Sequence, residues 1–292
     1  IMHCRTAWSD YFPGTNPSTT LVTNEYTSTQ TLSGTNVYVS NCLFDECSSS
    51  SNGGALYCSS VTCLLIESSS FFSCKTSNTN GGAFYFQNSN NGQCILNKVC
   101  GYDCCSTYTS SSSYDMFARM YLNSDQLGKN YVNYSSISRC VTDNSNSQYA
   151  LLSRHGNICY KSLNLSMNKC GSRVIYYYPS TDSNSVTGSL LYSTFADNIA
   201  IICCFICLGS GGIKYEIKSC NFLRNTQPLS NTGEGTIATY RNTIIEDSCI
   251  LENKAYYVLY ISSSSYTVTL SNCTVDPTSS NRNLITHKTV TK

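Results

Sequence analysis

The fold is decided by the stretch Val37-Tyr38-Val39-Ser40-Asn41-Cys42-Leu43-Phe44-Asp45-Glu46-Cys47, because its spacing of residue types recurs along the chain. With Phe44 as the anchor, apolar Val39 lies five residues earlier, small Cys42 lies two residues earlier, and Cys47 lies three residues later. The pattern returns at intervals of roughly 28 residues, a period typical of repeat proteins that stack one short unit on the next.

Two positions of the repeat are apolar in most copies, and we predict that each forms an inward-facing ladder. Stacked coils place equivalent residues about 4.8 Å apart, so each copy buries its side chain against the next. The anchor ladder is predicted to contain Phe44, Phe71, Ile137, Met167, Phe195, Phe222 and Ile250. The ladder five residues earlier is predicted to contain Val39, Ile66, Val132, Leu190, Ile217, Ile245 and Leu270.

The spacing within the repeat also predicts its corners. Side chains of a flat strand alternate between two faces, so a bend is needed before the small residue for all three positions to face inward. The residue three places after the anchor is Cys in early copies and Asn198, Asn225 or Asn253 in later ones. Asn tolerates left-handed backbone and bonds to neighbouring backbone groups, so we expect it at the next corner.

Two more apolar runs separate successive anchors. One follows a polar loop, as in Ala55–Cys58 and Ala83–Phe86, and the other precedes the next anchor, as in Thr62–Ile66. We find no amphipathic helix of useful length. The sequence therefore predicts an all-β fold, a right-handed parallel β-helix (solenoid) of about nine three-strand coils.

The repeat defines three parts of the chain. Residues 1–35 lack the anchor and are expected to form an N-terminal cap or partial coil, and residues 36–276 form the β-helix. The anchors Phe71 and Ile137 are 137 − 71 = 66 residues apart, so one more coil and an insertion near 101–130 are expected there. Residues 277–292 are expected to be a polar tail, and the absence of an initiator Met predicts an excised or processed segment.

Composition limits the possible partners. Only 12% of residues are charged and the net charge is +1, so the chain lacks the basic surplus that binds nucleic acid. The longest apolar run, 199–208, is too short to span a bilayer. The 19 cysteines favour an oxidising compartment and disulfides, although buried Cys also packs as a small apolar residue.

Three sequons add to the expectation of an extracellular or cell-surface glycoprotein. They are Asn133-Tyr134-Ser135, Asn164-Leu165-Ser166 and Asn272-Cys273-Thr274, so Asn133, Asn164 and Asn272 are the candidate glycosylation sites. Chance alone supplies a few sequons in a chain this rich in Ser, Thr and Asn. Cysteine density is therefore the more independent indication of a secretory route.

Two short motifs resemble those of a known family. Gly53-Gly54-Ala55-Leu56 and Gly81-Gly82-Ala83-Phe84 resemble the GGA-[ILV] motif, and Phe195-Ala196-Asp197-Asn198 and Phe222-Leu223-Arg224-Asn225 resemble the F-x-x-N motif. Both are typical of polymorphic-membrane-protein-like repeats in chlamydial outer-membrane proteins and trichomonad surface proteins. The resemblance covers roughly residues 36–276 and implies a parallel β-helix at the cell surface with a role in adhesion. Gly-Gly-Ala occurs only twice, and no autotransporter barrel is present in this sequence.

A carbohydrate-active enzyme, a β-helix polysaccharide lyase or glycoside hydrolase, is the alternative. The active sites of such enzymes need carboxylates that converge on one face. Arg154-His155-Gly156 is the fragment most similar to the motifs of pectin-degrading β-helices, but the other catalytic motifs of those enzymes do not accompany it. Exposed acids are usually solvated, so we expect no catalytic residue. The acids considered are Asp45, Glu46, Asp143, Asp182, Asp197, Glu216, Glu234, Glu246, Asp247 and Glu252.

Metal and cofactor chemistry is not expected either. His3-Cys4 has no second pair nearby, and Cys203 with the pair Cys204 and Cys207 lies in an apolar strand without the four converging ligands of structural zinc. Tyrosine runs such as Tyr176–Tyr178 suit sugar stacking but more often alternate between core and surface.

Three kinds of function follow from these observations. We expect a non-catalytic extracellular scaffold that is adhesive or self-associates into a filament, with cell-surface or glycan partners. A carbohydrate-active enzyme should instead carry carboxylates along one face. A filament subunit should associate through exposed strand edges at its ends.

Overall fold

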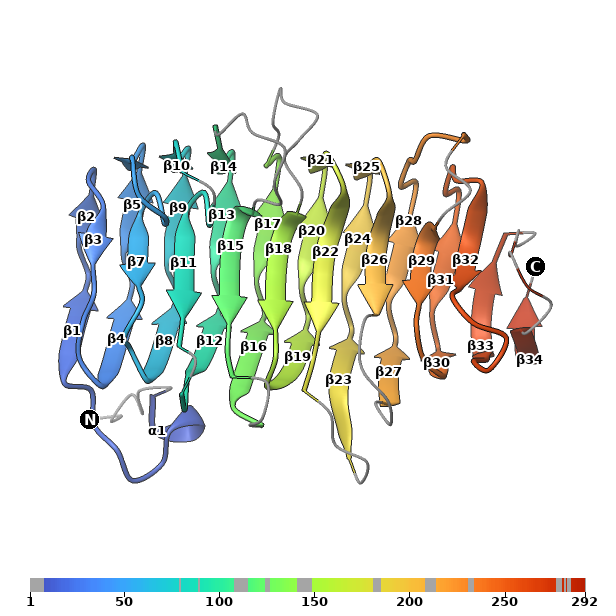
Figure 1. Cartoon of the computed structure of the whole chain (residues 1–292), viewed down its shortest axis with the longest axis horizontal. Coiled ribbons are helices and arrows are strands. Elements are labelled where there is room, and N and C mark those ends of the chain that lie inside the picture. Colours follow the sequence, from blue (N-terminus) through green and yellow to red (C-terminus); the bar gives the residue numbers. More distant parts are fainter. Residues whose placement is uncertain are drawn as a thin grey trace, which may run out of the picture.

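The computed structural model confirms the all-β prediction. It describes the chain except for residues 1–7, 79, 89, 108–114, 124–126, 141–148, 181–184, 208–213, 231–233, 277–279, 281, 283–284 and 292. The described strands pair in parallel and wind into a solenoid whose axis runs along the length of the molecule (Figure 1). One sheet has nine strands in the described part of the chain, with eight intervals between them, so the chain completes about eight turns.

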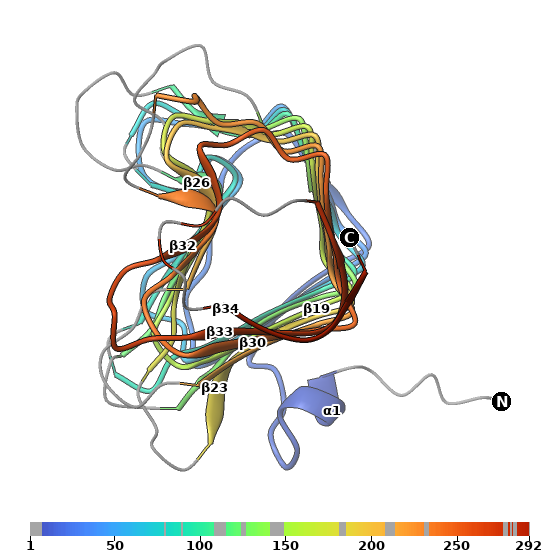
Figure 2. The ribbon, with the colours of Figure 1, turned by 90° about the vertical axis from the view of Figure 1, so that its right-hand side faces the viewer.

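Each full coil passes through three sides, which Figure 2 shows in projection along the axis. The first side contains β1 (Thr19–Val22), β4 (Asn36–Ser40), β8 (Cys63–Glu67), β12 (Gln93–Asn97), β16 (Lys129–Asn133), β19 (Asn157–Lys161), β23 (Val186–Leu191), β27 (Lys214–Lys218), β30 (Thr243–Glu246), β33 (Val268–Val275) and β34 (Ile285–Thr291). The second side contains β2 (Glu25–Tyr26), β5 (Leu43–Asp45), β9 (Ser70–Phe72), β13 (Cys100–Tyr102), β17 (Ser136–Ser138), β20 (Asn164–Ser166), β24 (Thr194–Ala196), β28 (Asn221–Leu223) and β31 (Cys249–Leu251).

The third side is the nine-stranded sheet, which faces the reader in Figure 1. It contains β3 (Gln30–Thr31), β7 (Leu56–Cys58), β11 (Phe84–Gln87), β15 (Asp115–Tyr121), β18 (Tyr149–Arg154), β22 (Arg173–Tyr178), β26 (Cys203–Cys207), β29 (Gly235–Thr239) and β32 (Tyr257–Ile261). Short strands between the second and third sides are β6 (Ser48–Ser49), β10 (Lys75–Thr76), β14 (Cys105–Ser106), β21 (Lys169–Cys170) and β25 (Ile199–Ala200).

The anchor ladder runs through the core on the second side. Phe44 stacks on Phe71 with ring centroids 4.7 Å apart, and Phe195 stacks on Phe222 at 4.9 Å. Burying each phenylalanine stabilises the fold by roughly 1.5–3 kcal/mol. In chain order the ladder contains Tyr26, Phe44, Phe71, Gly101, Ile137, Leu165, Phe195, Phe222, Ile250 and Val275.

The prediction that Met167 belongs to this ladder is wrong. Leu165 pairs with Ile137 on one side and Phe195 on the other, and its side chain is fully buried. Met167 is two residues later, at a corner with φ 57°, and 45% of its surface is exposed. The anchor was misplaced because Cys170 three residues after Met167 imitates the Cys that follows a true anchor.

The additional coil expected between Phe71 and Ile137 is present, and it occupies much of the stretch 101–130 where an insertion was also expected; residues 108–114 and 124–126 of that stretch lie outside the described residues. Strands β13, β14 and β15 lie between the coils of Phe71 and Ile137, and Gly101 occupies the anchor position. A Cβ atom on Gly101 would lie 2.4 Å from Cε2 of Phe117, which fills the space from the third side. An apolar anchor is absent because its volume is supplied from across the core.

The second ladder lies on the first side. Val39 pairs with Ile66, and Leu190 is followed by Ile217, Ile245 and Leu270. Leu21, Leu96 and Tyr160 complete it; the described members of the ladder are buried apart from half-buried Leu21.

Both ends of the described chain add strands to the solenoid. Within residues 1–35, β1, β2 and β3 already form a coil, while α1 (Trp8–Tyr11) lies outside the first side (Figure 2). Trp8 and Phe12 pack there against Leu65 and Ile95. Within residues 277–292, β34 pairs with β33, so the polar tail also contributes a strand.

Candidate functional site

The outer surface of the third side carries rows of aromatic and cationic side chains. Alternation along β7 places Leu56 and Cys58 in the core and turns Tyr57 outward. Five consecutive strands, β7, β11, β15, β18 and β22, repeat this alternation. We define the tyrosine face as the outward residues Tyr57, Tyr85, Tyr121, Arg154, Tyr176 and Tyr178.

Tyrosine rings stack within this face both between neighbouring coils and along one strand. The Tyr57 and Tyr85 rings are 5.4 Å apart and within 10° of parallel, and the Tyr176 and Tyr178 rings are 6.4 Å apart at 18°. Burial raises the pKa of the Tyr176 phenol, so its hydroxyl remains a donor across the physiological range. The face therefore presents the partly exposed rings of Tyr57, Tyr121, Tyr176 and Tyr178, whereas the Tyr85 ring is buried at 7% exposure.

Arg154 lies between two rings of the tyrosine face. Its Cζ atom is 5.1 Å from the ring centroid of Tyr121 and 5.5 Å from that of Tyr178. The Nε group donates a 3.1 Å hydrogen bond to Nε2 of His155, whose buried ring meets both tyrosines edge-on. Stacking of this kind holds a guanidinium in one orientation.

Two arginine–carboxylate pairs border the face. Arg173 donates from Nη2 to Oε1 of Glu234 at 2.8 Å and from Nε to Oε2 at 3.3 Å. Tyr240 donates to the same carboxylate at 3.2 Å. Glu234, one of the acids considered from the sequence, is thus largely buried and fully engaged.

Asp115 makes the second pair and was missed from the sequence because it lies in the stretch expected to be an insertion. Its Oδ2 atom is 3.4 Å from Nη1 of Arg119, and the side chain is fully buried. In the described part of the chain, Oδ1 has no hydrogen-bond partner. Burial raises the pKa of the Asp115 carboxyl to about 7, against the lowering effect of Arg119.

The two buried carboxylates come from backbone positions four strand spacings apart, and each is paired with a different arginine. Asp115 is in register with Tyr149, Arg173 and Cys203 in turn, and Glu234 precedes the next strand, β29. Four strand spacings amount to about 19 Å. Paired hydrolase carboxyls lie roughly 5–9.5 Å apart.

The other acids considered from the sequence do not converge on this face. Glu246 ends β30 and Asp247 occupies a corner with φ 51°, and both reach Lys218, at 3.6 and 3.8 Å. Asp197 pairs with Arg224 at 2.8 Å. Asp143 and Asp182 lie outside the described residues.

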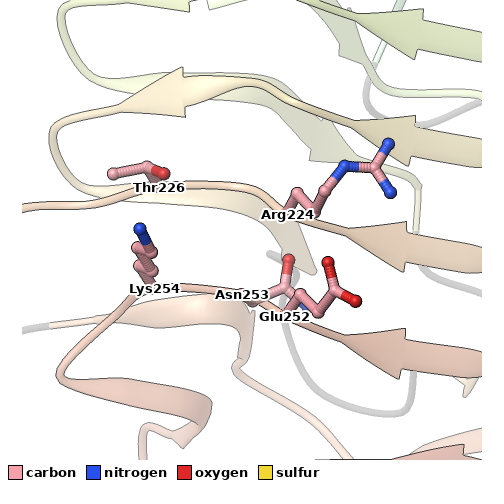
Figure 3. Close-up of a pocket in the computed structure, with 5 residues that line it drawn as sticks. All are labelled: Arg224, Thr226, Glu252, Asn253 and Lys254. Atoms are coloured by element: carbon pink, nitrogen blue, oxygen red, sulfur yellow. The ribbon is translucent and has the colours of Figure 1, made fainter.

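A shallow pocket lies at a corner near the C-terminal coils (Figure 3). It is lined by Arg224, Thr226, Glu252, Asn253 and Lys254. The Asn253 amide is engaged within the solenoid, donating to the Phe222 carbonyl oxygen at 2.7 Å, and Arg224 is paired with Asp197. The lining residues therefore serve mainly to hold adjacent coils together.

The described cysteines form neither disulfides nor a metal site. No disulfide joins the 17 cysteines described, and most of their thiols are buried. No group of three potential metal ligands occurs in the described ranges. Cys203 and Cys204 are both fully buried, whereas His3, Cys4 and the side chain of Cys207 lie outside what the structure describes.

The three sequon asparagines have different surroundings. Asn133 is buried and donates a 3.0 Å hydrogen bond to the Tyr11 hydroxyl under α1. Asn164 is half-buried in β20, while Asn272 is exposed at a corner and donates to Asp247 at 2.8 Å. Asn272 is thus the most accessible acceptor of the three.

Comparison with solved structures adds a distant likeness. The A-module of the mannuronan C-5 epimerase AlgE6 from Azotobacter vinelandii has 10% identity and a TM-score of 0.38, with 94% of this chain and 90% of that chain covered. No family model and no curated protein matches the chain. Among the described residues, no helix has both the length and the apolar character that crossing a membrane requires.

Proposed function

We propose that this chain is a non-catalytic β-helical scaffold that binds carbohydrate through the tyrosine face. The observation that carries the proposal is the set of outward tyrosine rings on β7, β11, β15 and β22, which are four of five consecutive strands, with Arg154 on the fifth, β18. Tyr57 and Tyr176 are partly exposed, and they project from strands whose inward side chains are buried in the core. A rigid ring that is apolar on its face and polar at its rim suits a sugar, which has an apolar C–H face and peripheral hydroxyls.

An extracellular, adhesive role is part of the same proposal. It is supported by the resemblance of the repeats to cell-surface β-helices and by the exposed sequon at Asn272. Cysteine density supports it less than the sequence suggested, because buried thiols such as Cys74 and Cys104 serve as packing residues. Self-association into filaments remains a proposal, which sedimentation across a concentration series would test.

A carbohydrate-active enzyme is the second candidate, and Asp115 is the observation that favours it. A carboxyl with a pKa of about 7 suits proton transfer near neutral pH. Its contact with Arg119 and its full burial fit a structural pair equally well. A single base suffices for a lyase, so activity on uronate polymers is the form of this candidate that the geometry allows.

Glycan binding to the folded chain tests the proposal directly. The double variant Tyr57→Ala/Tyr176→Ala removes two ring faces, and we expect it to weaken binding to an immobilised polysaccharide panel at least tenfold. Tyr102→Ala, which removes an exposed tyrosine from the second side, is the matched control and should bind like the wild type. Circular dichroism and the thermal midpoint establish that all three chains are folded.

The outcomes separate the two candidates. Equal binding by the double variant and the control would overturn the scaffold proposal. Release of oligosaccharides by the wild type, abolished in Asp115→Asn, would establish the enzyme instead. Binding without turnover, lost only in the double variant, supports the scaffold.

A further inference from the structure

We infer that the tyrosine face selects an acidic glycan and that Arg154 contacts its anionic substituent. This inference rests on the proposed carbohydrate binding and adds the class of ligand. It depends on three observations: the orientation of the guanidinium, the charges around it, and the place of Arg154 within the ring rows.

The guanidinium of Arg154 is held in place before any ligand arrives. Tyr121 and Tyr178 contact it from neighbouring coils, and the Nε donor is occupied by His155. The backbone around His155 is itself fixed, because His155 donates from its main-chain nitrogen to the Tyr178 carbonyl oxygen at 2.6 Å. An arginine ordered in advance loses little conformational entropy when it binds.

Arg154 differs from the other two arginines of this region in its charge environment. Arg119 contacts Asp115 at 3.4 Å, and Arg173 is paired with Glu234 at 2.8 Å. Within the described part of the chain, no carboxylate forms an ion pair with Arg154. The cationic charge on the tyrosine face is therefore left for a ligand, and the two terminal amino groups of its planar fork match a carboxylate or a sulfate.

The position of Arg154 connects the anionic group to the sugar chain. Arg154 and Tyr178 are paired in register on β18 and β22, and Tyr176 lies two residues before Tyr178 on the same face. A sugar stacked on Tyr176 would place a substituent within one coil of the guanidinium. Carboxylates of uronic acids and sulfate esters share the required chemistry, and the probes below distinguish them.

Matched polysaccharides test the charge requirement. Polygalacturonate and its fully methyl-esterified form share a backbone but differ in charge, and dextran sulfate and dextran form the corresponding sulfate pair. We expect the wild type to prefer the charged member of at least one pair by about tenfold or more, as charge-assisted hydrogen bonds provide. The preferred pair identifies carboxylate or sulfate, and the preference should fall with added salt.

Variants then assign the preference to Arg154. Arg154→Gln should bind the charged and uncharged members alike while keeping the residual affinity for the uncharged polymer. Arg154→Lys should recover only part of the preference, because an ammonium lacks the planar fork. Arg139→Gln is the matched control, since Arg139 lies 6.0 Å from the Tyr102 ring on another side of the solenoid.

The failure of this inference is distinguishable from the failure of carbohydrate binding. Equal binding of both members by the wild type, or an unchanged preference in Arg154→Gln, overturns the acidic-glycan inference alone. Absence of binding to all four polymers overturns both. Loss of preference in Arg139→Gln to the same extent as in Arg154→Gln would show a non-specific charge effect and would also overturn the inference.

Discussion

The backbone N–H of Cys140 donates a 3.0 Å hydrogen bond to Oδ1 of Asn168, and this bond joins a ladder of thiols to a ladder of amides. Cys104 precedes it in the thiol ladder and directs Sγ to the Phe71 carbonyl oxygen at 3.5 Å. Asn198 follows in the amide ladder and donates from Nδ2 to the Leu165 carbonyl oxygen at 2.9 Å. Cys and Asn thus perform the same task, bonding to the anchor carbonyl of the preceding coil.

Asn does more than Cys at this position. The amide of Asn198 accepts a 3.0 Å hydrogen bond from the backbone nitrogen of Asn168 and donates at 3.0 Å to Oδ1 of Asn225. The left-handed corner residue is the one before it, Asp197, with φ 57°. The sequence-based expectation placed Asn at the corner itself; Asn198 instead follows the left-handed residue, and its side chain is buried inside the solenoid.

The amide ladder predicts a graded response to substitution at Asn198. Asn198→Ala leaves a buried backbone donor and carbonyl unpaired, which should lower the free energy of unfolding by roughly 1–3 kcal/mol. Asn198→Cys should lose less, because its thiol restores the bond to the carbonyl. The midpoints of urea unfolding at unchanged slope measure the difference in stability. Equal losses of stability in the two variants would show that the thiol occupies space without forming a stabilising hydrogen bond.

The anchor ladder predicts opposite behaviour at two residues that are close in sequence. Leu165→Ala creates a cavity beside Ile137 and Phe195 and should lower stability by about 2–5 kcal/mol. Met167→Gly removes an exposed side chain from left-handed backbone, so thermal unfolding should show little change or a small gain. A larger loss at Met167 than at Leu165 would restore the original assignment of the ladder.

Gly101 and Phe117 should be energetically coupled. A Cβ at residue 101 meets the Phe117 ring at 2.4 Å, so Gly101→Ala should cost about 1–3 kcal/mol through overpacking. In a Phe117→Leu background the added methyl group has more room, and its cost should shrink. A double-mutant cycle measures the coupling, and strictly additive losses would contradict the compensation.

Asp115 should make stability depend on pH in a defined window. The unfolded carboxyl loses its proton near the ordinary aspartate pKa of 3.8, whereas the folded carboxyl retains it up to about 7. The folded state therefore binds more protons between these values, and its stability falls as the pH rises through them. The shift sets an upper bound on the order of 4 kcal/mol.

Asp115→Asn should remove this contribution and flatten the stability profile between pH 4 and pH 7. Asp197→Asn is the control of opposite sign, because the Arg224 hydrogen bond lowers the pKa of the Asp197 carboxyl. Its stabilising effect is lost as the pH falls through that lowered pKa. Identical profiles for the wild type and Asp115→Asn would contradict the raised pKa.

The coils with apolar anchors were predictable from the sequence because the relevant spacing is short. Val39, Phe44 and Cys47 lie within nine residues, and the same interval returns whenever the chain re-enters the stack. The anchor of the additional coil between Phe71 and Ile137 was not identified, since Gly101 has no side chain and Phe117 supplies the missing volume from another side. The spacing of residues within one repeat does not show that a side chain from another side of the coil fills the space at Gly101.

Apart from the anchor misassigned to Met167, the sequence by itself determined which residues of the two ladders face inward, because alternation and repeat spacing fix the direction of each side chain along a strand. Only the tertiary structure decided which outward residues meet. Tyr121, Arg154 and Tyr178 come from three coils separated by loops of unequal length, and their contact depends on the register of β15, β18 and β22. Register is set by hydrogen bonds between distant segments, so the stack of Arg154 between two tyrosines exists only once the coils have closed.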